Sequence, residues 1–239
     1  MLVPLFVSSL CIVLLLRLSI NEPRYLIPAA AVVVVTLLPA FLARRRIRRV
    51  LMSGDVHRVL RAWQRTMDRV PHPETMAPLM IATAYASYGW LEPAHMALSR
   101  AVKGPAWEAA REQRLFVEAL LSTFEGEPQI AAEKARELEQ LPLPSSGPFL
   151  RRRVMQLRAG VAALVRAFSH QSDASDEKRL AKAASASPIV HWAMRYGEAI
   201  VAIDHGAPER ARKIIAEAPA WPAQSAFASF HAELVGKLG

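Results

Sequence analysis

The chain has 239 residues, of which 52% are hydrophobic and 21% charged. This composition suffices for a buried core and excludes a wholly disordered chain. A formal net charge of +9 favours an anionic partner, such as phospholipid, nucleic acid or an acidic protein surface. The single cysteine, Cys11, permits no internal disulfide and no cysteine-based zinc site.

The first 43 residues contain two apolar segments. Residues 2–20 are uncharged except for Arg17, and residues 25–43 form an uninterrupted run of 19 uncharged residues. A helix of that length is roughly 28 Å long, close to the thickness of the hydrocarbon core of a bilayer. The sequence therefore predicts a transmembrane helical hairpin over 1–43. The second segment spans the bilayer, and the first does so if Arg17 snorkels to the interface.

This region also has interpretations other than a transmembrane hairpin. A cleaved signal peptide is disfavoured, because no Lys or Arg precedes the first apolar segment and "RLSINEP" has no small-residue cleavage pattern. A buried hairpin of a soluble protein stays open, because Pro28 and Pro39 are unfavourable inside a helix. Membrane helices tolerate proline better, which favours the transmembrane interpretation.

An arginine cluster directly follows the second apolar segment: Arg44, Arg45, Arg46, Arg48 and Arg49. The loop before that segment carries only Arg17 and Arg24 at its margins. The positive-inside rule therefore places residue 44 and the rest of the chain in the cytosol, with the cluster against anionic head groups. Nucleic acid is the alternative partner, but no aromatic residue alternates with these arginines, so none is expected.

Residues 44–239 are predicted to form an all-α domain. Beyond residue 50, apolar side chains recur at intervals of three and four, as in helices. Gly54, Gly89, Gly126 and Gly206 are 35, 37 and 80 residues apart, and 80 is two periods of about 40. The sequences "GEP" and "GAP" at the last two glycines place proline in the first turn of a following helix. We expect about five antiparallel helix pairs.

Two parts of this domain depart from the glycine pattern. Residues 148–186 are expected to form a longer helix, a polar turn and a second helix, a divergent pair that fills the gap before Gly206. Residues 221–239 place Phe227, Phe230 and Leu234 on one face of a helix, which is typical of a helix that caps a repeat stack.

The surroundings of Gly89 resemble the tetratricopeptide repeat, a helix-turn-helix unit of about 34 residues. Where this family has the small or bulky residues of a helix crossing, the chain has Ala82, Tyr85, Ala94, Leu98 and Ala101. Around Gly126 and Gly206 the alanines are kept, but Ser122 and Ala202 replace the aromatic residue. The segment order is similar to that of HemY-like bacterial inner-membrane proteins. The resemblance implies an α-solenoid anchored in a bacterial inner membrane.

No motif for catalysis or metal binding occurs in the sequence. The seven histidines form no H-E-x-x-H or H-x-H pattern, and there is no phosphate-binding loop, nucleophile elbow or dinucleotide fingerprint. Asp173 and Asp176 are close in sequence, but "SHQSDASDEK" is typical of a solvated turn and helix cap. We expect no enzymatic activity, no metal and no cofactor.

The repeat resemblance implies a protein- or peptide-binding surface on the concave face of the first helices. The residues expected there are Met76, Leu79, Met80, Thr83, Gln113, Phe116 and Leu120. This apolar lining suits a partner helix or hydrophobic peptide, although the two methionines fit a core equally well. The sequence thus predicts a membrane-anchored scaffold or adaptor. The alternative is an accessory or regulatory subunit of a membrane enzyme or transporter, interacting through the hairpin.

Overall fold

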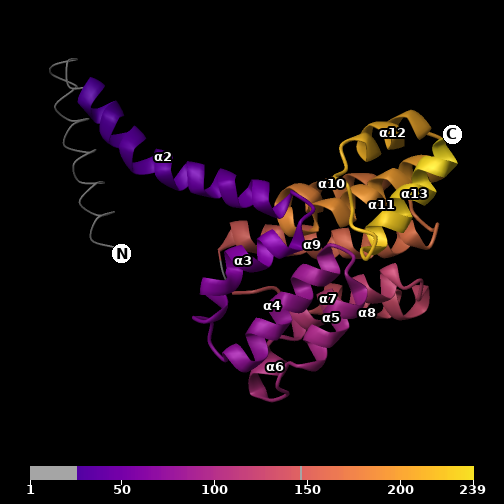
Figure 1. Cartoon of the computed structure of the whole chain (residues 1–239), viewed down its shortest axis with the longest axis horizontal. Coiled ribbons are helices and arrows are strands. Elements are labelled where there is room, and N and C mark those ends of the chain that lie inside the picture. Colours follow the sequence, from indigo (N-terminus) through magenta and orange to yellow (C-terminus); the bar gives the residue numbers. More distant parts are fainter. Residues whose placement is uncertain (1–25, 146) are drawn as a thin grey trace. The chain divides into compact units, whose positions relative to one another are not determined.

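All regular secondary structure in the computed structural model is helical over the residues that it describes, 26–145 and 147–239, which confirms the predicted all-α class. Figure 1 shows the helices in chain order. They are α2 (Leu26–Leu51), α3 (Val56–Met67), α4 (Pro73–Ser87), α5 (Leu91–Ser99), α6 (Pro105–Ala109), α7 (Arg111–Phe124), α8 (Pro128–Gln140), α9 (Pro148–Phe168), α10 (Ala174–Ala186), η2 (Pro188–Val190), α11 (His191–Asp204), α12 (Pro208–Ala216) and α13 (Ala226–Leu238).

The chain divides into two compact units, residues 1–49 and 50–239. The described part of the first unit is α2, a single helix that continues through Pro39 and through the arginine cluster. The last two residues of α2 belong to the second unit, which also holds α3 to α13. The predicted apolar segment 2–20 lies outside the described residues.

Three of the predicted glycines close helix pairs in the second unit. Gly89, Gly126 and Gly206 have positive φ angles of 71°, 76° and 74°, and each lies between a first and a second helix. In all three turns the N–H of the residue after the glycine donates to the carbonyl five residues earlier, over 2.7–2.9 Å. Glycine adopts this left-handed conformation without the strain of a Cβ, which is why the first helix ends there.

The pair α9–α10 has a histidine where the other turns have glycine. His170 has a φ of 52°, and the N–H of the next residue donates to the carbonyl of Arg166 over 2.8 Å. The His170 ring nitrogen Nδ1 lies 3.0 Å from the carboxylate of Asp204 at the end of α11. The prediction of a divergent pair over 148–186 is confirmed, and His170 explains why the glycine spacing doubles there.

The helix pairs stack so that the first helix of each pair contacts both helices of the pair before it. Thus α7 packs on α4 and α5, α9 on α7 and α8, and α11 on α9 and α10. Small residues allow these close crossings. The alanines with no exposed surface include Ala82, Ala94, Ala119, Ala131, Ala199 and Ala211, all at positions that the repeat pattern predicts.

Helix α13 covers the ends of several pairs instead of the last pair alone. Its predicted apolar face packs into the core through Phe227, Phe230 and Leu234. The Phe227 ring lies 5.2 Å from that of Phe124, at the end of α7, and the Ala226 N–H donates to the Gly89 carbonyl over 2.8 Å. A cap on a linear stack contacts only its neighbouring repeat. Here the C-terminal segment returns to the first pairs.

The start of the second unit is held against later parts of the chain. The Trp192 Nε1–H donates to the carbonyl of Met52 over 2.8 Å, and the Tyr88 hydroxyl donates to the carbonyl of Leu51. Leu51 and Ile189 pack against the same small core cluster. Residues 51–52 are therefore fixed to α4, η2 and α11, inside the second unit.

Candidate functional site

The first helices α4, α7 and α9 line an open pocket of about 420 Å³, which we call the first-helix pocket. Its main lining side chains are Met76 and Thr83 from α4, Glu112, Gln113 and Phe116 from α7, Leu157 and Arg158 from α9, and Ile189 from η2. A pocket of this volume lies within the range of small-ligand sites. It can receive one or a few side chains of a partner.

Hydrogen bonds between helices hold the polar side chains that line the first-helix pocket. The amide Nε2 of Gln113 donates to the hydroxyl of Thr83 over 3.0 Å, which joins α7 to α4. Arg158 Nε donates to the carboxylate of Glu112 over 3.1 Å, and the same guanidinium donates to the carbonyls of Leu141 and Pro142. The polar groups are thus positioned before any partner arrives, which lowers the ordering cost of binding.

The apolar part of the lining is formed by Met76, Phe116, Leu157 and Ile189. The Arg158 side chain is only 5% exposed and its donors already have acceptors, so it offers little free charge. An apolar wall with a few fixed polar groups is the usual composition of a binding pocket.

The predicted binding residues fall into two groups. The structure brings Met76, Thr83, Gln113 and Phe116 together in the first-helix pocket. It places Leu79 and Leu120 in the core, where both have no exposed surface, and Phe116 is itself only 6% exposed. Met80 is half-buried. The prediction that Leu79 and Leu120 lie on an open face is wrong, because neighbouring helices pack around both α4 and α7.

Sequence reasoning missed the pocket residues beyond the first two pairs. Leu157, Arg158 and Ile189 come from α9 and η2, which no glycine pattern marks. A signal was nevertheless present: Arg158 is the single charge within "VMQLRAGVAALV", and an arginine inside an apolar helical run is usually buried with partners. The buried guanidinium that reaches Glu112 matches that rule.

Two buried carboxylates with shifted pKa values serve helix packing. Burial raises the pKa of Glu198, which pairs with Arg195 over 2.7 Å. For Asp176 burial also favours a higher pKa, but hydrogen bonds from Arg166 and from the backbone N–H of Asp173 outweigh it, so the pKa is lowered. Asp176 joins α9 to α10 through Arg166, and both acids are nearly inaccessible to solvent. Their surroundings indicate structural roles.

All five members of the arginine cluster are exposed on α2. Among the described residues, none of the helices combines the length with the mean hydropathy that a membrane span requires. Within that same part of the chain, no group of three or more His, Cys, Asp or Glu side chains is arranged to hold a metal ion.

Comparisons with known proteins leave the family of this chain open. No protein-family model matches it, and neither the curated proteins nor the solved structures contain a significant match.

Proposed function

We propose that the protein is a membrane-anchored scaffold or adaptor, which binds a partner protein or peptide through the first-helix pocket on the cytosolic side of a bacterial inner membrane. The observation that carries the proposal is the pocket itself. Three successive first helices contribute to it, its polar groups are fixed, and much of its lining is apolar. Recognition of protein by side chains on adjacent helices is the usual function of helical repeats.

The chemistry of the pocket favours a partner helix or an apolar peptide. Met76, Phe116 and Ile189 present polarizable or apolar atoms, which suit Leu, Met or aromatic side chains of a partner. Gln113 and Glu112 belong to the same lining and have amide and carboxylate oxygens that can accept N–H groups. An acidic partner fits less well, because Glu112 would repel it and Arg158 is already engaged.

Support for the membrane anchor comes from the sequence. Residues 25–43 are uncharged, and the arginine cluster follows them immediately. Near an anionic leaflet each arginine contributes about 1 kcal/mol, so the cluster adds on the order of 5 kcal/mol to attachment and sets its orientation. The two apolar segments form the proposed hairpin, and the second unit is proposed to be a tetratricopeptide-like solenoid.

The test compares two methionine variants of the full chain expressed in its native membranes. Met76→Lys introduces a charge into the first-helix pocket, whereas Met96→Lys makes the same change on α5, where the methionine is 45% exposed. We expect affinity capture to recover a specific partner with the wild type and with Met96→Lys, and to lose it with Met76→Lys. Equal capture by both variants would contradict the proposal.

The alternative interaction through the hairpin gives a different result in a second comparison. If residues 1–43 are exchanged for an unrelated membrane anchor, an adaptor retains its partner, because the first-helix pocket is unchanged. An accessory subunit that interacts through the hairpin loses its partner in this exchange. The same subunit keeps its partner in the Met76→Lys variant.

A further inference from the structure

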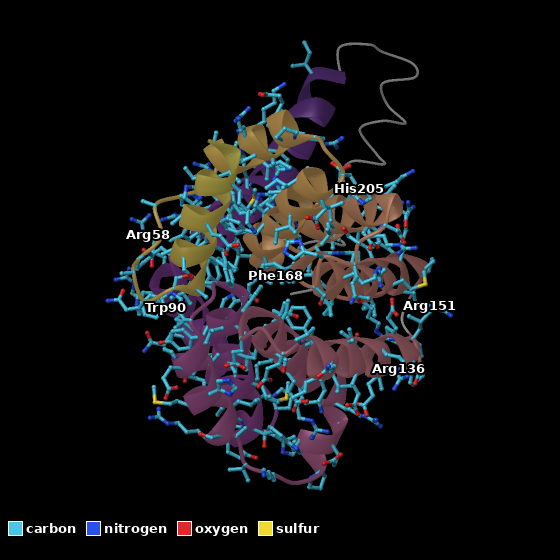
Figure 2. The ribbon with its side chains drawn as sticks, turned by 90° about the vertical axis from the view of Figure 1, so that its right-hand side faces the viewer. Arg58, Trp90, Arg136, Arg151, Phe168 and His205 are labelled. Atoms are coloured by element: carbon cyan, nitrogen blue, oxygen red, sulfur yellow. The ribbon has the colours of Figure 1, made fainter. Side chains whose placement is uncertain are left out.

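The first turns of α9 extend beyond the helix with which they pair. α9 has 21 residues and α10 has 13, and the Arg153 guanidinium donates to the carbonyl of Ala186, the last residue of α10. The turns that precede Arg153 therefore project past α10. In Figure 2, Arg151 lies at an outer edge of the molecule, on the opposite side of the view from Trp90.

These projecting turns expose apolar and basic side chains together. Phe149 is 74% exposed and Met155 is 47% exposed, although both are large apolar residues. Residues 149, 152 and 155 are three apart and therefore share one side of the helix, with Arg152 between the two apolar side chains. Arg151 and Arg152 are exposed, and among the described residues neither has an ion pair. We call these four residues the α9 patch.

We propose that the α9 patch is a second membrane-contact site, which binds the anionic phospholipid surface. This inference rests on the membrane anchoring proposed above. Phe149 and Met155 insert among the upper acyl chains, while the guanidinium groups of Arg151 and Arg152 hydrogen-bond lipid phosphates. Mixed basic and apolar surfaces are typical of helices that lie at the interface of anionic bilayers. The chain thereby gains a contact that restrains the orientation of the second unit.

The experiment uses the full chain in lipid nanodiscs, with Cys11→Ser so that a spin label can be attached at one position. Three single-cysteine variants are compared: Met155→Cys in the α9 patch, Met96→Cys as the matched control on α5, and Ile47→Cys within the arginine cluster. Met155 and Met96 have nearly equal exposure, 47% and 45%. The relative accessibility of each label to oxygen and to a water-soluble nickel chelate gives its depth.

In nanodiscs containing phosphatidylglycerol, we expect the label at 155 to lie about 5–10 Å within the interface and the label at 96 to be aqueous. Replacing phosphatidylglycerol by phosphatidylcholine, or Arg151 and Arg152 by Gln, should release the label at 155. Each arginine should change the ratio of immersed to aqueous label about fivefold, so the double replacement should change it about 25-fold.

The failures of the two proposals are distinguishable. If the label at 155 is as aqueous as the label at 96, while the label at 47 lies at the membrane interface, the α9 patch does not bind lipid. The membrane anchor is then still supported. A label at 155 that is shielded from both reagents would indicate protein contact and also overturn the inference. If the label at 47 is aqueous and the chain does not enter nanodiscs, the membrane anchor itself is wrong.

Discussion

Gly160 provides the sharpest test of how α9 and α10 cross. A Cβ added at this position would lie 2.2 Å from the Cβ of Ala183, whereas two carbon atoms in contact prefer about 3.5–4.0 Å. The Ala183 Cβ is fixed to its backbone and cannot rotate away. Gly160→Ala therefore forces the two helices apart by roughly 1.5 Å at their crossing.

Two opposing contributions determine the change in the free energy of unfolding. Overpacking of a core costs about 1–3 kcal/mol, while alanine favours a helix interior over glycine by about 1 kcal/mol. We expect Gly160→Ala to lower the free energy of unfolding by about 1–2 kcal/mol, because rigid atoms place the packing cost near the upper end. Gly236 is the matched control: it lies in α13, and an added Cβ would meet no atom within 4 Å. Gly236→Ala should stabilise by about 0.5–1 kcal/mol.

Thermal unfolding of the full chain in detergent, followed by circular dichroism, measures both variants. In a chain of this size about 1 kcal/mol corresponds to about 2–4 °C, so the midpoints of Gly160→Ala and Gly236→Ala should differ by about 5–10 °C. Adding Ala183→Gly to Gly160→Ala should recover the packing cost. If Gly160→Ala stabilises as much as Gly236→Ala, or if Ala183→Gly gives no recovery, the close crossing is wrong.

Two further predictions concern the α9–α10 turn. His170→Val should lower the free energy of unfolding by about 1–2 kcal/mol, because β-branched residues are strained at positive φ. His205 has an ordinary negative φ, so His205→Val should change the free energy of unfolding by under about 0.5 kcal/mol. Equal urea midpoints for the two would contradict this. Asp176→Asn leaves Arg166 without its carboxylate and should lower the free energy of unfolding by about 2–3 kcal/mol at pH 7. Asp173→Asn keeps the helix cap and should lower it by about 0.5 kcal/mol or less. Because the folded pKa of Asp176 is lowered, its stabilisation is present above the unfolded pKa of about 4 and is lost as the pH falls through the folded pKa, so the difference in stability between wild type and Asp176→Asn should shrink on acidification. A pH-independent difference would refute this.

The sequence contained enough information to place the helix pairs. Gly89, Gly126 and Gly206 mark left-handed turns because few residues adopt that conformation without strain, and Pro128 and Pro208 mark helix starts for a similarly local reason. Such signals act within a few residues. They can therefore be recognised without knowledge of the rest of the fold.

Burial was harder to predict because it depends on distant neighbours. Leu79 lies on a first helix at a position that could face outward, yet it has no exposed surface, since other helices pack on both sides of α4. The first-helix pocket likewise depends on Arg158 and Ile189, which are brought to α7 only by tertiary packing. The polar turn between α9 and α10 was predicted, but the left-handed conformation of His170 in it was not, because histidine carries no strong conformational signal.

The central claim is that a partner protein occupies the first-helix pocket of the membrane-attached chain. Photo-crosslinking in intact cells tests it most directly, with a benzophenone amino acid placed at Gln113, which lines the pocket, or at Glu133, which is exposed on α8. We expect a discrete protein adduct from position 113 in the membrane fraction and none from position 133. The same adducts from both positions, or no adduct from position 113, would contradict it.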